Sequence, residues 1–83
     1  MTLSQRLPSR QLIALNTKIY RELLGLSQER LAEEAGFHRT YISQVERSVA
    51  NVSADGLDKL AHALGISPAQ LLQPTQKVSE REV

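Results

Sequence analysis

Serine and glycine residues divide this chain into segments that are each about the length of a short helix. A serine before a helix accepts a hydrogen bond from the first turn, and a glycine after a helix ends it in the left-handed conformation. Between these residues Ala, Leu, Glu, Gln and Arg dominate, and the alternation typical of strands is absent. The expected caps are Ser9, Ser27, Ser53 and Ser67, and the expected stops are Gly25, Gly36 and Gly65.

These signals agree along the whole chain and predict an all-α fold, a compact five-helix bundle. The helices are expected at 10–24, at 28–35, from His38 or Arg39 onward, at 54–64, and from Pro68 to a stop at Pro74. We expect residues 1–8 to be an N-terminal extension, residues 9–73 to be one folded domain, and residues 74–83 to be a flexible tail.

Apolar residues recur at helical spacing and define the expected core. In the first helix the expected apolar face is Leu12, Ile13, Leu15, Ile19, Tyr20, Leu23 and Leu24, with Lys18, Arg21 and Glu22 in solvent. In the later helices the inward residues are expected to be Leu31, Ala32, Ala35, Ile42, Val45, Leu57, Leu60, Ala61 and Leu64.

Length and charge narrow the classes of protein to consider. The chain has 83 residues and no cysteine, which suits one small domain without disulfides. Such a domain often gains stability by pairing with a second copy, so a homodimer is expected. Ten Lys and Arg against nine Asp and Glu give a net charge of +1, so nucleic-acid binding would need charges segregated by face. No membrane span or signal-peptide core is present, and we expect a cytoplasmic protein.

The segment from Ser27 to Arg47 carries the strongest functional signal. It predicts a short capped helix, a glycine turn and a second helix, which is the geometry that presents a recognition helix to the major groove of double-stranded DNA. An arginine can bind guanine O6 and N7 together, and a threonine can offer its methyl to thymine. The expected base contacts are Arg39, Thr40, Ser43 and Gln44. The alternative is that these residues form only the solvated face of an amphipathic helix.

Other polar residues around this segment are candidates for binding the DNA backbone. Gln28 lies at the start of the preceding helix, where free N–H groups suit a phosphate. His38, Arg47 and Asn51 are further candidates. Arg6 and Arg10 are open to two interpretations, a DNA-binding arm or a solvated N-terminus.

Residues 16 to 73 resemble the lambda-repressor and Cro type of helix-turn-helix domain, the XRE family. The resemblance rests on Leu26-Ser27-Gln28-Glu29-x-Leu31-Ala32-x-x-Ala35-Gly36, on Ile42-Ser43-x-x-Glu46, and on Leu57-x-x-Leu60-Ala61-x-Ala63-Leu64-Gly65-Ile66-Ser67. Within that family, 38–47 and 51–53 are similar to the controller proteins of restriction-modification systems, which are compact dimeric transcription regulators. One departure is Ser48-Val49-Ala50, where family members commonly have a glycine, so the connector is expected to follow a slightly different path.

The resemblance implies roles for individual residues. It assigns Gln28 and Arg47 to phosphates and Tyr41 to a backbone or shape contact with DNA. It assigns Glu46 a structural role, tying the third helix to the rest of the domain. It also implies that Leu71 and Leu72 form a dimer interface, although a short apolar helix of this kind can simply close the core.

Enzymatic and metal-binding roles are not expected. His38 and His62 have no cysteine or inward carboxylate at ligand spacing, so neither is expected to bind a metal. Glu33 and Glu34 are adjacent and point in different directions on a helix, which does not suit a catalytic pair. No cofactor and no small-molecule ligand is expected.

The alternative function is a protein-interaction module, such as the antitoxin of a toxin–antitoxin pair. The polar tail argues against it, because a segment that wraps a partner needs apolar anchors.

Overall fold

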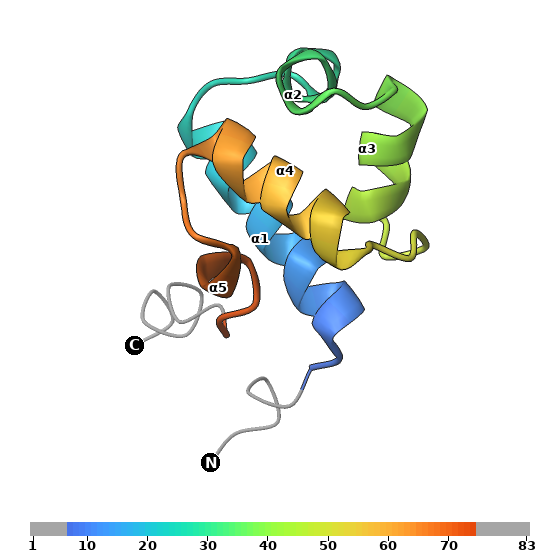
Figure 1. Cartoon of the computed structure of the whole chain (residues 1–83), viewed down its shortest axis with the longest axis vertical. Helices are drawn as coiled ribbons and strands as arrows, with labels where there is room; N and C mark the ends of the chain where they lie inside the picture. The colour runs from blue at the N-terminus through green and yellow to red at the C-terminus, as the bar shows by residue number, and fades with distance from the viewer. Residues whose placement is uncertain (1–6, 75–83) are drawn as a thin grey trace.

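A computed structural model describes residues 7–74, which contain helices and no strand. Figure 1 shows α1 running through the middle of the molecule, with the other helices arranged around it. The expected all-α bundle of five helices is therefore confirmed. Arg6, most of the expected N-terminal extension and all but Pro74 of the expected tail lie outside the described residues. The helices are α1 Ser9–Leu23, α2 Gln28–Ala35, α3 Arg39–Glu46, α4 Ala54–Leu64 and α5 Pro68–Leu71.

Three of the four expected serine caps are confirmed. The Oγ atoms of Ser27 and Ser53 each accept a hydrogen bond of 2.9 Å from the amide three residues later. Ser67 forms a capping box with Gln70, in which each side chain bonds the other residue's backbone amide. The prediction for Ser9 is wrong, because Ser9 is the first residue of α1 and the N-cap is Pro8, which makes no side-chain hydrogen bond.

Helices α1 to α4 end in the same hydrogen-bonded motif. Gly25, Gly36 and Gly65 have φ angles of 72°, 79° and 73°, so all three expected stops are confirmed. Ser48, at φ 67°, is the non-glycine residue with positive φ in the described segment. Its amide donates to Val45 O and the amide of Val49 donates to Gln44 O, the same Schellman pattern that ends the helices before the glycines. The connector thus begins with a serine in a conformation that costs an L-residue about 1–2 kcal/mol.

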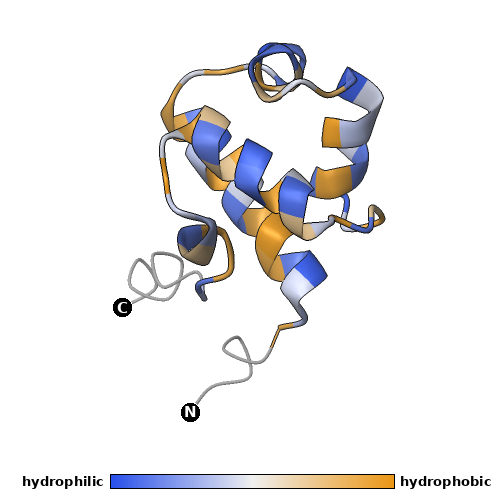
Figure 2. Cartoon of the chain, in the orientation of Figure 1, coloured by the Kyte–Doolittle hydropathy of each residue, from blue (hydrophilic) through white to orange (hydrophobic). Residues whose placement is uncertain are grey.

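The core lies where α3, α4 and α5 meet one side of α1, and α2 packs against α3 and α4. Figure 2 shows the apolar residues of α3 on the side that faces the other helices. The expected inward residues of α2, α3 and α4 are confirmed as buried, except that Leu57 is only partly buried. The buried cluster consists of Ile13, Leu31, Ala32, Ala35, Ile42, Val45, Ala50, Leu60, Ala61, Leu64 and Leu71.

The buried face of α1 differs from the expected one. Leu15, Leu23 and Leu24 are 44%, 63% and 54% exposed, so placing them on the core face was wrong. The polar residues Asn16 and Thr17 are buried instead. The inward face follows residues 12–14, 16 and 17, because α3, α4 and α5 cover that side of the helix and leave the leucines at its end uncovered.

Asn16 holds the end of α5 against α1. Its Nδ2 donates to the carbonyl oxygens of Leu71 at 2.9 Å and Gln73 at 2.8 Å. Leu71 is wholly buried in this contact, whereas Leu72 lies just after the helix and is 36% exposed. The expected dimer contact at Leu71 therefore needs correction, because its side chain has no free surface for a second chain. Of Leu71 and Leu72, only Leu72 has an exposed side chain that could contact a second copy.

Arg21 was expected in solvent, and this prediction is wrong. Its side chain is 11% exposed and forms two hydrogen bonds with the Glu46 carboxylate, Nε–Oε2 at 2.6 Å and Nη2–Oε1 at 3.0 Å. The Arg21 Nη1 also donates to Leu26 O at 2.7 Å. This pairing raises the already high pKa of Arg21. One guanidinium thereby ties α1 to the turn before α2 and to the end of α3, and the structural role expected for Glu46 is confirmed.

Replacing Arg21 with methionine should reduce the free energy of unfolding by about 3 kcal/mol. The variant keeps apolar volume but leaves the 5%-exposed Glu46 carboxylate without its cationic partner. Denaturant unfolding monitored by circular dichroism measures the loss. Arg21→Met combined with Glu46→Leu should recover most of it, because the uncompensated charge is gone. A loss below about 1 kcal/mol for Arg21→Met alone, typical of a surface pair, would contradict this account.

Replacing Ser48 with glycine should stabilise the protein by roughly 0.5–1 kcal/mol, because relief of the left-handed strain exceeds the added flexibility of the unfolded chain. The matched control is Gly36→Ser, which places a serine at φ 79° with nothing within 4 Å of its Cβ. That change should lower stability by a similar amount. Thermal unfolding of both variants tests the pair, and a melting temperature of Ser48→Gly below that of the wild type would contradict the prediction.

Candidate nucleic-acid interface

The two helices α2 and α3 meet through a tight turn. Gly36 ends α2, and the amide of Phe37 donates to Ala32 O at 2.8 Å, which closes the turn. Residue His38 is the N-cap of α3 and is exposed, with no side-chain capping hydrogen bond. Leu31 of α2 and Ile42 of α3 are both fully buried, so the two helices pack as one unit. The first turn of α3 is held at the molecular surface as a result.

The first turn of α3 exposes Arg39 and Thr40. One turn later, Ser43 and Gln44 are half-buried on the same helix. Within residues 7–74 no carboxylate lies within salt-bridge distance of Arg39, and the one acid of α3, Glu46, is bound by Arg21. The outer side of α3 therefore offers hydrogen-bonding groups and positive charge to a ligand, without competing negative charge.

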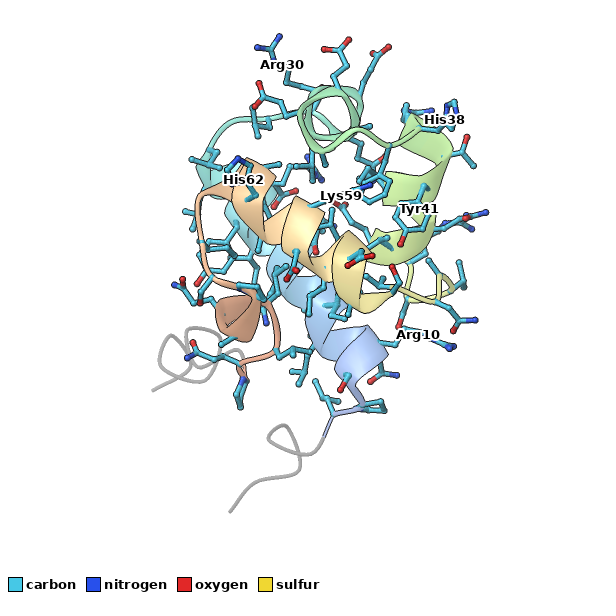
Figure 3. The ribbon with its side chains drawn as sticks, viewed as in Figure 1. Arg10, Arg30, His38, Tyr41, Lys59 and His62 are labelled. Atoms are coloured by element: carbon cyan, nitrogen blue, oxygen red, sulfur yellow. The ribbon has the colours of Figure 1, made fainter. Side chains whose placement is uncertain are left out.

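The acidic residues of this region lie on α2 instead. Glu33 and Glu34 are exposed, and Arg30 on the same helix pairs with them at 3.9 Å and 3.0 Å. Figure 3 shows Arg30 on α2 at one end of the molecule, apart from Tyr41 on α3. Although the net charge is only +1, the exposed positive charge of Arg39 lies on α3 and the exposed acids of these two helices lie on α2.

Gln28 is fixed at the start of α2 by the same carboxylate that binds Arg21. Its Nε2 donates to Glu46 Oε1 at 3.0 Å, and the side chain is half-buried. Because a carboxylate only accepts hydrogen bonds, this contact sets which way the amide group faces. The second N–H of the amide stays available to an acceptor at the molecular surface.

Tyr41 packs between α3 and the start of α4. Its ring centroid lies 4.6 Å from that of Phe37, and a Cβ built on Gly56 would lie 3.5 Å from the Tyr41 hydroxyl. Lys59 of α4 lies over the Phe37 ring at 5.6 Å, and Figure 3 places Lys59 and Tyr41 on facing helices. Burial raises the pKa of Tyr41, so the phenol is protonated at neutral pH and can donate a hydrogen bond. The Tyr41 hydroxyl also lies close to the backbone of the first turn of α4.

The connector after α3 brings a residue of α1 next to the candidate interface. Arg47 and Asn51 are exposed, and Arg10 Nη2 donates a hydrogen bond to Asn51 Oδ1. Sequence patterns gave no reason to pair Arg10 with Asn51, because the residues are 41 positions apart. The contact places one more cation beside the residues at the end of α3.

The described residues contain no candidate metal site and no candidate membrane span. Across residues 7–74 no cluster of three His, Cys, Asp or Glu side chains could hold a metal ion. In the same part of the chain no helix has the length and apolarity needed to cross a membrane. His62 is exposed on α4.

A helix-turn-helix family model matches residues 18–71 of the chain. A hypothetical transcription factor from Neisseria meningitidis is 41% identical over 81 residues, which are 93% of this chain and 76% of that protein. These matches include every candidate contact from Gln28 to Asn51.

Two solved structures resemble the fold closely. The restriction-modification controller protein C.AhdI from Aeromonas hydrophila has a TM-score of 0.72 and 40% identity, and the match covers 75% of this chain and 94% of that one. The biofilm master regulator SinR, solved in complex with DNA, has a TM-score of 0.70 and 37% identity over 74% of this chain and 98% of that one. Both cover the helices that carry the candidate interface.

Proposed function

We propose that this protein binds a palindromic operator as a homodimer. The proposal starts from its family: the chain belongs to the XRE-type helix-turn-helix family and is a sequence-specific DNA-binding transcription regulator. In this proposal α3 of each copy lies in the major groove, and the two half-sites are about 34 Å apart, one helical turn of DNA. The protein would act in the cytoplasm, where the DNA of its bacterial relatives lies, and without catalysis of its own.

The exposed first turn of α3 is the observation that carries the proposal. Arg39 and Thr40 project from it, and no described carboxylate neutralises Arg39. An arginine in this position can donate to guanine O6 and N7 together, which is the commonest specific contact in the major groove. We assign Arg39 and Thr40 to base recognition at the end of the helix. Ser43 and Gln44 are assigned to the neighbouring bases, since they lie one turn further along.

Backbone contacts would set the register of α3 in the groove without reading sequence. We assign this role to residues in and around α3, all of which have exposed or half-buried side chains. The hydrogen bond from Gln28 to Glu46 supports its role, because a side chain held in place loses less entropy when it binds a phosphate. The assigned residues are Gln28, His38, Tyr41, Arg47 and Asn51.

The homodimer is supported by the size of the domain and by exposed apolar residues. A palindromic site requires two copies related by a two-fold axis, and a small domain without disulfides gains stability from such pairing. Leu72 follows α5 and is 36% exposed, so we propose that it contributes to the contact between copies. Sedimentation equilibrium measures the fraction of dimer in the free protein. Leu72→Glu should lower that fraction, because it places a charge in the proposed contact.

Replacing Arg39 with alanine should weaken binding to the selected operator by about 1–3 kcal/mol per half-site and relax the preference at one base pair. Alanine favours helices, so α3 should remain folded. Selection of binding sites from random duplexes, followed by titration of the wild type and the variant, measures both effects. If Arg39→Ala selects the same sequence with the same stringency, the assignment of base recognition is wrong.

Gln28→Ala should weaken binding to all sequences by a similar factor, because a phosphate contact carries no sequence information. Arg30→Ala is the matched control for Arg39→Ala, because Arg30 is an arginine that is paired with acids on α2 and lies outside the proposed contact. Its affinity should equal that of the wild type. A change of selected sequence for Gln28→Ala would contradict its assignment to the backbone.

A further inference from the structure

Arg10 and Asn51 form a pair of side chains between α1 and the connector. Arg10 lies in the first turn of α1, and its Nη2 donates to the Asn51 side-chain oxygen. Both residues are exposed. Figure 3 shows Arg10 projecting from α1 on the side of the molecule where Tyr41 lies. The contact joins a segment before the helix-turn-helix to one after it.

The hydrogen bond leaves free N–H donors on both side chains. The amide oxygen of Asn51 is occupied by Arg10, so the amide N–H groups of Asn51 face away from the guanidinium. The guanidinium has no acceptor atom, and its remaining N–H groups are free of this contact. Two adjacent groups with free N–H donors, one of them cationic, form a site suited to an anion with several oxygen atoms.

The surroundings add no negative charge that would compete with an anion. A hollow of about 310 Å³ beside Arg10 is lined by Pro8, Arg10, Gln11 and Ser48. Among residues 7–74, no carboxylate lies within salt-bridge distance of Arg10. Glu46 lines the neighbouring hollow, but its carboxylate is bound by Arg21.

We infer that Arg10 and Asn51 together bind one phosphate of the DNA backbone, which extends the contact with DNA from the helix-turn-helix to α1. This inference rests on the proposed function, because the anion is a phosphate of the operator. Asn51 supplies neutral donors, and Arg10 supplies the charge and holds the amide in the donating orientation. Because Arg47 and Asn51 flank the end of α3, the site lies where the backbone would leave the groove that α3 occupies.

The test is the salt dependence of binding to the selected operator. Arg10→Gln removes the cation and should make the slope of log K against log salt shallower by about 0.9 per protein copy, or about 1.8 for a dimer. The preferred sequence should not change. Asn51→Asp keeps the acceptor for Arg10 but replaces the outward donors with negative charge, so it should weaken binding more than Arg10→Gln does.

The matched control is Arg30→Gln, an arginine at the surface of α2 that should leave the slope as in the wild type. Thermal unfolding of Arg10→Gln should match the wild type, which separates loss of a DNA contact from loss of fold. Operators in which single phosphates are replaced by neutral methylphosphonate locate the contact. At one phosphate per half-site the wild type should lose much more affinity than Arg10→Gln does, because the variant has no cation left to lose there.

Each outcome is decisive. If the wild type binds a selected palindrome but Arg10→Gln has the wild-type slope, this inference is wrong and the proposed function stands. The same conclusion follows if the wild type and Arg10→Gln respond identically to every methylphosphonate. If the wild type selects no DNA sequence, both the proposed function and this inference fail.

Discussion

The carboxylate of Glu46 is the group on which the arrangement of the first three helices depends. Arg21 binds it from α1, and Gln28 binds it from the start of α2, while Glu46 itself ends α3. The same guanidinium also binds the Leu26 carbonyl before α2. A buried ion pair gains little net stability by comparison with apolar side chains, but it accepts few alternative geometries. Its value here is that it fixes the angle at which α3 meets the rest of the domain.

This constraint also shapes the charge of the surface. The one acid on α3 is bound by Arg21 inside the domain, and two of the exposed acids of α2, Glu33 and Glu34, pair with Arg30. The outer side of α3 and the connector therefore have Arg39 and Arg47 without an acidic partner in the described part of the chain. A nearly neutral protein can attract DNA in this way, because the phosphate backbone responds to the local charge near the contact.

Features encoded within a few residues were predictable from the sequence, and features that join distant residues were not. Caps at Ser27, Ser53 and Ser67 involve amides three residues away, so the helix starts could be inferred directly. The partners of Arg21 and Asn16 lie 25 and 55 positions away, and helical periodicity alone placed Arg21 in solvent. Exposure of Leu23 and burial of Thr17 likewise depend on which side of α1 the other helices cover. The candidate base contacts could be named because they lie on two successive turns of one helix, whereas Arg10 joins Asn51 only through the tertiary fold.

The central claim is that the constraints on α3 direct Arg39 into the major groove of a two-fold symmetric site. The most direct measurement is a crystal structure of the protein bound to the duplex that it selects. We predict one α3 in the major groove of each half-site, with the Arg39 guanidinium hydrogen-bonded to a base edge and Gln28 on a phosphate. A complex in which α3 lies outside the groove, or in which Arg39 touches only backbone, would contradict the account.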